Sequence, residues 1–284
     1  MDRGTKMKSV LITGCSSGIG LCIALGLKDK GYRVFATARK NKDVEMLKKK
    51  GLDDALMLDL RSSKSIQDCV QTLFSKSPDL YALIHNGAYG QVGALEDISR
   101  KTLEKQFQTN VFGWHELSNL VIPKMKQKNQ GRIVYISSVL GFVAMPFRGA
   151  YNSSKFAVEG MVNTLRLELL NTDIQLSLIQ PGPIESKFRQ NAYQAFKRNI
   201  VVEDSDYQKS YVQMIKRLNS EDPVQFTLSP EAVLKCCVHA LEAKRAKIHY
   251  WVTFPTKLFA VLNRILPARI MDRILFKAGD GGKR

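Results

Sequence analysis

Tyr151 and Lys155 are the pair of residues whose types and spacing most directly suggest chemistry. They lie four positions apart, so on a helix both side chains would share one face. A phenol near its usual pKa of about 10 is a poor acid–base catalyst at neutral pH, and a nearby ammonium would lower that pKa. Ser138 precedes Tyr151 and could hold the same substrate oxygen. Together, the three side chains could exchange a proton with a carbonyl or alcohol oxygen.

A glycine-rich segment near the N-terminus supports this interpretation, because the spacing of Tyr151 and Lys155 alone is common by chance. Thr13-Gly14-Cys15-Ser16-Ser17-Gly18-Ile19-Gly20 follows an apolar run and opens a helix-like segment. Gly14 would permit a tight turn, Gly18 would let the backbone approach a pyrophosphate, and Gly20 would allow close helix packing. The free N–H groups of the helix would bind the phosphates. This context predicts a dinucleotide site.

The end of the second apolar run indicates which dinucleotide would bind. The run ends Phe35-Ala36-Thr37-Ala38-Arg39-Lys40, without the acid that an NAD site usually has there. Arg39 stands where the 2′-phosphate of NADP needs a cation, and Ser16 could donate a second hydrogen bond. The alternative is that Arg39 is only a solvated surface residue. The sequence therefore predicts NADP(H).

Short β-branched apolar runs alternate with helix-like segments along the chain, which predicts βαβ units and a doubly wound, seven-stranded parallel sheet. Asp59 and Asn86 end the third and fourth runs, at the carboxyl edge where such a sheet binds its ligand. Helices are expected over segments such as Gly18–Lys30 and Ser99–Gln127. The seven expected strands are Ser9–Thr13, Tyr32–Ala38, Ala55–Asp59, Tyr81–His85, Arg132–Ser138, Ile174–Gln180 and Ile248–Val252.

Two segments interrupt this alternation. Residues 183–230 are long, polar and rich in aromatic residues, and we interpret them as a substrate lid; a disordered insertion is the alternative. Residues 255–284 carry seven Lys/Arg and two Asp, with apolar residues at helical spacing on both sides of Pro267. They predict two amphipathic basic helices, packed on the substrate region or on another subunit, or else lying on an anionic membrane.

Composition narrows the class of protein. The 284 residues suit one α/β domain, and no run is apolar enough for a transmembrane helix or a signal peptide, so we expect a cytoplasmic protein, with membrane association as an open alternative. The net charge of +17 is spread along the chain without a nucleic-acid-binding motif, so no nucleic acid partner is expected. The five cysteines lack metal-ligand spacing, which predicts reduced thiols and no metal.

These motifs, over residues 8 to about 252, closely resemble the short-chain dehydrogenase/reductase family. The resemblance implies a Rossmann-fold domain over residues 1–254 with a helical C-terminal extension. It also implies that Tyr151 is the general acid/base, that Lys155 tunes it and binds the nicotinamide ribose, and that Ser138 positions the substrate. Asn110 would hold a water in a proton relay. The residues that carry the resemblance are Thr13–Gly20, Asn86, Asn110, Ser138, Tyr151, Lys155 and Pro181-Gly182-Pro183-Ile184.

The resemblance also places further residues beside the cofactor. Pro181 to Ile184 and Ser186 would contact the nicotinamide carboxamide. Tyr151 and Lys155 belong to this cofactor set as well as to the catalytic one. The other members of the expected set are Gly14, Ser16, Ser17, Gly18, Ile19, Gly20, Arg39, Asp59, Leu60, Asn86, Gly87 and Val111.

One departure from the family is visible at His85-Asn86-Gly87-Ala88, where the usual pattern is Asn-Asn-Ala-Gly. We expect His85 to be buried and hydrogen-bonded, not catalytic. The glycine-rich loop and Ala36-Thr37-Ala38-Arg39 most resemble the 17β-hydroxysteroid and retinol dehydrogenase branch, which implies a lipophilic carbonyl or alcohol substrate. Val143 and Met145 would line its pocket beside Ser138 and Tyr151, although they could equally be ordinary core.

The sequence thus predicts an NADP(H)-dependent oxidoreductase, and we expect a homodimer or homotetramer. Two alternatives remain: a catalytically silent NADP(H)-binding regulatory protein, and a peripheral membrane protein whose basic tail dominates its role. The joint presence of Asn110, Ser138, Tyr151 and Lys155 favours the enzyme.

Overall fold

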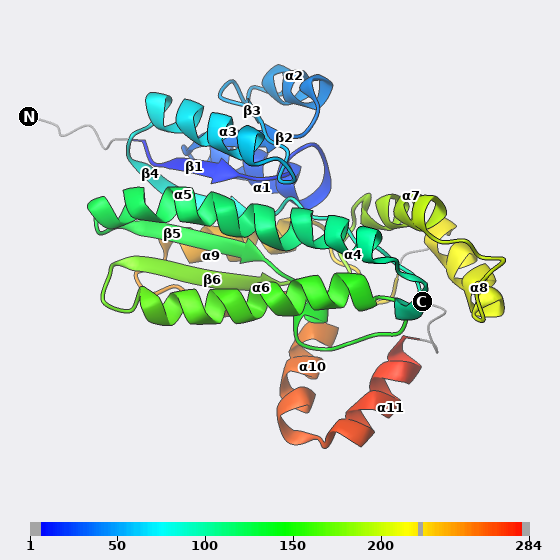
Figure 1. Cartoon of the computed structure of the whole chain (residues 1–284). Coiled ribbons are helices and arrows are strands. Elements are labelled where there is room, and N and C mark those ends of the chain that lie inside the picture. The colour runs from blue at the N-terminus through cyan, green and yellow to red at the C-terminus, as the bar shows by residue number, and fades with distance from the viewer. Residues whose placement is uncertain (1–6, 221–223, 280–284) are drawn as a thin grey trace, which may run out of the picture.

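The computed structural model describes residues 7–220 and 224–279, and its centre is a seven-stranded sheet with every strand parallel to its neighbours (Figure 1). The strand order is β3-β2-β1-β4-β5-β6-β7. This confirms the predicted doubly wound α/β fold. The strands are β1 (Ser9–Ile12), β2 (Arg33–Ala38), β3 (Leu56–Met57), β4 (Leu80–His85), β5 (Gly131–Ile136), β6 (Ile174–Gln180) and β7 (His249–Trp251).

Helices cover both faces of the sheet because successive strand residues are apolar on both faces. Val10 and Ile12 of β1 belong to one buried cluster, and Leu11 between them belongs to the other. The first cluster is covered by α1 (Gly18–Asp29), α2 (Asn41–Lys49) and α9 (Glu231–Glu242), and the second by α3 (Ser63–Lys76), α5 (Gly113–Gln127) and α6 (Gly149–Glu168).

The helix expected over Ser99–Gln127 is interrupted. It forms α4 (Arg100–Phe107), then a π-helical turn at Gln108–Phe112, then α5. Such turns often occur at functional sites, because the extra residue shifts the register of the helix. Here the turn contains Asn110.

The described part of the segment 183–230 is helical and ordered by its own core. It forms α7 (Phe188–Asn199) and α8 (Gln208–Asn219), beside the carboxyl edge of the sheet (Figure 1). Phe196 and Tyr211 are buried in a cluster that also contains Val92 from the loop after β4. A single parallel bridge joins Ile184 to Leu228 and closes the base of the segment.

The C-terminal extension forms two helices on either side of Pro267, α10 (Phe254–Ile265) and α11 (Ala268–Ala278). Phe259, Met271 and Leu275 are buried against Val139 and Val143, in the loop that follows β5. One face of the extension therefore packs on the substrate side of the domain. No helix within residues 7–220 or 224–279 is long and apolar enough to cross a bilayer.

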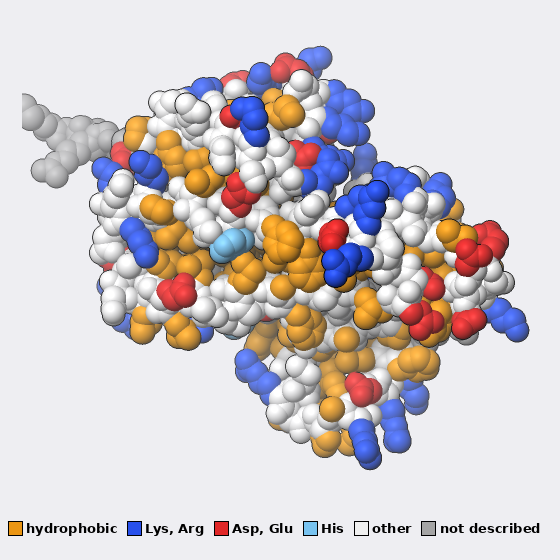
Figure 2. Space-filling model, viewed as in Figure 1, with side chains coloured by type: hydrophobic (Ala, Val, Ile, Leu, Met, Phe, Trp, Pro, Cys, Tyr) orange, Lys and Arg blue, Asp and Glu red, His pale blue; other side chains and the backbone are white. Residues whose placement is uncertain are grey.

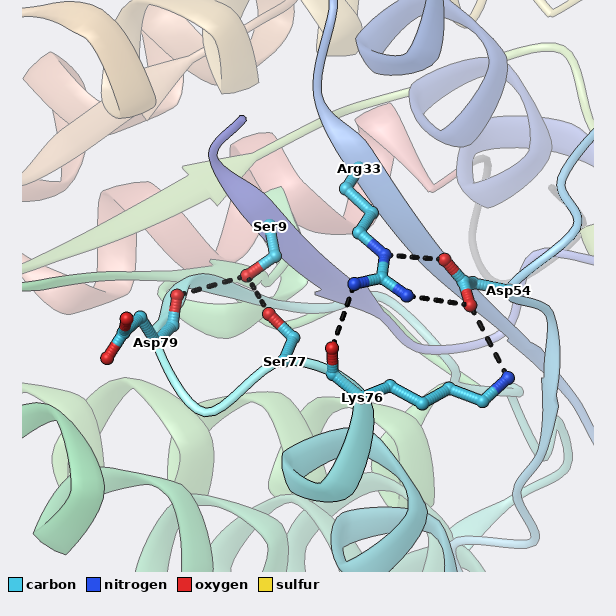
Figure 3. Close-up of polar contacts among 6 residues, drawn as sticks. All are labelled: Ser9, Arg33, Asp54, Lys76, Ser77 and Asp79. Atoms are coloured by element: carbon cyan, nitrogen blue, oxygen red, sulfur yellow. Dashed lines mark hydrogen bonds and ion pairs between the residues drawn. The ribbon is translucent and has the colours of Figure 1, made fainter. Parts of the chain in front are cut away.

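A network of hydrogen bonds and ion pairs lies at the amino edge of the sheet (Figure 3). Arg33 at the start of β2 binds the Asp54 carboxylate with Nε 2.6 Å from Oδ2, and its Nη1 donates to the Lys76 carbonyl at 2.8 Å. The Arg33 hydrogen bond lowers the pKa of Asp54. Because the pair is partly exposed, we expect it to add only modestly to stability.

Candidate active site

A cavity of about 870 Å³ opens at the carboxyl edge of the sheet. Parallel strands end at one edge, so the loops after β1, β4, β5 and β6 meet there. The structure brings most of the sequence-predicted residues to its wall: Gly14, Ser16, Ser17, Gly18, Ile19, Gly20, Asn86, Gly87, Ser138, Met145, Tyr151, Lys155, Pro181, Gly182, Ile184 and Ser186.

The glycine-rich loop has the shape of a phosphate cradle. Gly14 has φ +72°, and a Cβ there would lie 2.5 Å from the Cα of Gly87. A Cβ on Gly20 would lie 2.3 Å from the Gly14 carbonyl oxygen, so both positions require glycine. Ser17 precedes α1 and its side chain makes no capping hydrogen bond. The helix N-terminus therefore presents its N–H groups at the cavity wall, and the loop fits a dinucleotide pyrophosphate.

Asn86 braces this loop from the end of β4. Its Nδ2 donates to the carbonyl oxygens of Thr13 and Gly14, both at 3.0 Å. In return the Thr13 hydroxyl accepts from the backbone N–H groups of Asn86 and Gly87 at 2.9 and 2.8 Å. These four hydrogen bonds join the buried carboxyl end of β1 to the loop after β4, although the residues that follow Asn86 differ from the expected pattern.

Four of the predicted cofactor residues lie outside the cavity wall. Arg39 is exposed at the end of β2 and makes no hydrogen bond or ion pair to any described residue. Asp59 pairs with Arg61, whose Nη2 lies 2.6 Å from Oδ2, and this hydrogen bond lowers the pKa of Asp59. Leu60 and Val111 are buried in the core, so a cofactor contact there would need their backbone or the edge of their side chains.

Ser138, Tyr151 and Lys155 are brought together as the spacing suggested. Ser138 follows β5, and its hydroxyl accepts from the Leu140 N–H at 3.1 Å. Tyr151 lies in the first turn of α6, with the ring of Phe188 edge-on at 5.2 Å between ring centres. Lys155 lies one turn further, its Nζ 5.7 Å from the Tyr151 ring centre.

Burial dominates the electrostatics of this group. It raises the pKa of Tyr151 well above its usual range, and hydrogen bonding by Ser138 acts against that rise. It also lowers the pKa of Lys155 to about 7. The expectation that Lys155 lowers the pKa of the Tyr151 phenol is therefore incomplete. With its pKa lowered to about 7, Lys155 is only partly protonated at neutral pH.

Three residues that the sequence did not point to contact Lys155 or favour its charged form. Nζ donates to the Ile136 carbonyl at 2.8 Å and lies 4.4 Å from the ring centre of Trp114. Glu159, one turn further along α6, is buried and raises the pKa of Lys155. The Nε2 of Gln180 donates to both Glu159 carboxylate oxygens at 3.0 Å. Only the spacing of Glu159 from Lys155 was visible as a signal in the sequence.

Asn110 is fully buried in the π-helical turn, outside the cavity wall. Its amide group accepts from the Tyr89 N–H at 3.2 Å and donates to the Tyr89 carbonyl at 2.9 Å. It also donates to the Ser154 hydroxyl at 3.1 Å, in the catalytic helix. The side chain thus links the loop after β4 to α6, and its expected role in a proton relay stays a prediction.

His85 is buried and hydrogen-bonded, as predicted. Its Nε2 lies 2.9 Å from the Ser118 hydroxyl, and its ring stacks against both Trp114 and Tyr135. Burial lowers the pKa of His85 to about 3, so the ring is neutral at physiological pH. It contributes packing beneath Lys155 and no titrating group.

Several apolar side chains line the cavity. Met145 lines it, whereas Val143 is buried behind the wall against the C-terminal helices and does not line it. The C-terminal extension supplies lining residues that the sequence did not assign to the site. Lining residues not foreseen include Arg148, Phe188, Leu218, Phe226, Phe254, Leu258 and Phe259.

Comparison with known proteins decides the family. The short chain dehydrogenase family model matches residues 8–196. The chain belongs to the short-chain dehydrogenase family. It is accordingly an oxidoreductase that acts on CH–OH groups and uses a nicotinamide dinucleotide.

Individual relatives agree with this assignment. The chain is 41% identical over 276 residues to the uncharacterized oxidoreductase YbbO of Escherichia coli K12, covering 94% of each chain. It is 38% identical over 190 residues to human retinol dehydrogenase 8, covering 64% of this chain and 60% of the relative. The closed form of serine dehydrogenase complexed with NADP+ superposes with a TM-score of 0.74 at 22% identity, covering 87% and 95% of the two chains. Within the family, the 284-residue chain is similar to the retinol dehydrogenase branch.

Proposed function

We propose that this short-chain dehydrogenase is specific for NADP(H) and interconverts a lipophilic ketone or aldehyde with its alcohol. The observation that carries the cofactor choice is Arg39. It is an exposed guanidinium that makes no hydrogen bond or ion pair to a described residue, at the end of a strand that lacks an acid, and its charge acts on Asp59 only at longer range. A planar guanidinium is suited to the 2′-phosphate of NADP through charge-assisted hydrogen bonds.

The lining of the cavity supports the substrate class. The wall that contains Tyr151 also contains Met145, Phe188, Leu258 and Phe259, and such apolar side chains suit a bulky apolar molecule. The similarity to retinol dehydrogenase 8, whose name refers to a lipophilic alcohol, is consistent with such a substrate.

The residues of the chain would divide the chemistry as follows. When bound, the nicotinamide exchanges a hydride with the substrate carbon. Ser138 holds the substrate oxygen, and Tyr151 donates a proton to that oxygen during reduction or accepts one during oxidation. Lys155, which contacts Trp114 and whose charge Glu159 favours, stabilises the phenolate that remains. The apolar wall excludes water from the reacting atoms.

A substrate panel tests this proposal. Steroids, retinoids, long-chain aldehydes and small ketones are incubated with NADPH, and oxidation of NADPH is followed by absorbance. We expect kcat/KM to be highest for bulky apolar carbonyls. Turnover of small polar ketones alone would contradict the substrate class. Tight NADPH binding with no turnover of any carbonyl or alcohol would favour a catalytically silent regulatory protein.

Arg39→Ala tests the cofactor choice, with Lys40→Ala as a matched control that removes a neighbouring exposed charge. Loss of a charged hydrogen-bond partner costs about 1.5–3 kcal/mol, so the preference for NADPH over NADH should fall about tenfold or more. Lys40→Ala should change it little. A wild-type protein that prefers NADH, or an unchanged preference in Arg39→Ala, would exclude NADP(H) specificity.

A further inference from the structure

Helix α10 carries an apolar stripe that is largely exposed in the described structure. Phe254, Leu258, Val261 and Ile265 are 59%, 41%, 51% and 67% exposed. Their spacing of four, three and four residues places them on one face of the helix. The opposite face of the same helix, which includes Phe259, is already buried in the domain. The exposed stripe is therefore not needed for the helix to pack, and a continuous exposed apolar face indicates a contact site.

The charges around the stripe are almost entirely positive. Lys257 and Arg264 lie on α10, and all the Lys and Arg side chains of α10 and α11 are exposed. The two helices contain one acidic residue, Asp272. Within the described residues it forms no ion pair with a Lys or Arg of α10 or α11. In Figure 2, the lobe formed by α10 and α11 shows Lys and Arg side chains around its outer edge beside hydrophobic side chains. The other cations of this lobe are Arg269, Arg273 and Lys277.

The stripe is continuous with the mouth of the active-site cavity. Phe254 and Leu258 line the cavity and are also exposed on the surface. Phe226, at the end of the segment that carries α7 and α8, lines the cavity as well and contacts Phe254 with 5.3 Å between ring centres. An apolar occupant of the stripe would therefore adjoin the opening of the cavity.

We propose that the exposed stripe of α10 and the cations of α10 and α11 form a docking surface for an anionic lipid bilayer. An apolar face flanked by Lys and Arg side chains suits the boundary between acyl chains and anionic headgroups. A second copy of the chain fits this surface poorly, because a two-fold contact would bring the cations of both copies together with one acid in each. The docking is independent of the substrate, and goes beyond the proposed reaction.

Vesicle co-sedimentation tests this surface, without substrate or nicotinamide. The full-length protein is mixed with vesicles of phosphatidylcholine alone or of phosphatidylcholine with phosphatidylglycerol. We expect binding to the mixed vesicles that weakens with added salt, and little binding to phosphatidylcholine alone. The double variant Val261→Glu, Ile265→Glu should reduce binding to the mixed vesicles at least about tenfold, because both changes place a carboxylate in the acyl region.

Met57→Glu is the matched control, since Met57 is 50% exposed on β3, at the opposite end of the sheet from β7. It should bind vesicles as the wild type does. A second variant, Arg269→Gln with Arg273→Gln, leaves the stripe intact and should weaken binding to anionic vesicles only. Thermal unfolding verifies that each variant is folded.

Two results would overturn the proposal. The first is wild-type protein that does not bind anionic vesicles, or that binds them as well after Val261→Glu, Ile265→Glu as before. The second is a wild-type dimer in light scattering that this double variant converts to a monomer, which would assign the stripe to a second copy. Turnover of a water-soluble substrate should be unchanged in the double variant, so loss of docking is separable from failure of the proposed function.

Discussion

Glu159→Gln should move the pH dependence of carbonyl reduction, because Glu159 supports the charge on Lys155. The substitution keeps the shape of the side chain and one oxygen that can accept from Gln180, but removes the carboxylate charge. Two side chains one helical turn apart are separated by about 6 Å, so at an effective dielectric constant of about 20 their interaction is about 2.8 kcal/mol. That corresponds to about two pKa units. It is an upper limit, because burial raises the pKa of Glu159 and so disfavours the charged form that interacts with Lys155.

The sign follows from the role of Lys155 in its protonated form. Reduction should be fast below the pKa of Lys155, about 7, and should slow as the pH rises through it. Groups that face Lys155 are Tyr151 and Glu159 on α6 and neutral His85 on β4. Removal of the carboxylate leaves burial unopposed, which lowers the pKa of Lys155 further. The decline in activity should therefore begin at lower pH, by up to about two units.

The assay measures kcat/KM for reduction of a carbonyl substrate at saturating NADPH. The pH is varied from about 5 to about 9, a range that brackets the pKa of Lys155. Glu168→Gln is the matched control, because Glu168 is an exposed acid on the same helix. It should leave the midpoint in place. A Glu159→Gln variant that is slower at every pH but keeps the wild-type midpoint would refute the electrostatic role and leave only a structural one.

Other substitutions and one exchange measurement address the rest of the site. Tyr151→Phe should reduce turnover at least about a hundredfold while NADPH still binds, and near-normal turnover would exclude Tyr151 as the acid. Gly20→Ala should weaken NADPH binding at least about tenfold, because its Cβ would lie 2.3 Å from the Gly14 carbonyl; Gly160→Ala, with no atom within 4 Å, should bind normally. Between about pH 6.5 and 3, His85 is neutral in the folded chain and protonated in the unfolded chain. Lowering the pH through this range should therefore reduce the free energy of unfolding of the wild type more than that of His85→Asn, by up to about 1.4 kcal/mol per pH unit. Denaturant unfolding at several pH values measures that difference, and equal slopes would contradict it. Residues 183–230 should gain hydrogen-exchange protection when NADPH and a substrate analogue bind, and equal protection in both states would argue against a lid.

Features that depend on local chemistry are predictable from the amino-acid sequence alone. The alternation of strands and helices follows from short-range hydrophobic periodicity, so all seven strands were foreseen. Gly14 and Gly20 were recognisable because a tight turn and a close helix each require glycine at a fixed position. Tyr151 and Lys155 were recognisable because four residues of helix place them together whatever surrounds the helix.

The surroundings of those residues, in contrast, depend on the tertiary structure. Trp114 contacts Lys155 and Gln180 fixes Glu159 although these pairs are distant in the sequence, and the resulting burial sets the pKa values of Tyr151 and Lys155. The neighbouring loop residues Val143 and Met145 have the same apolar character, yet only Met145 lines the cavity, because α10 and α11 cover Val143. A residue's type and spacing specify its own geometry, whereas desolvation and cavity shape depend on which distant segments pack against it.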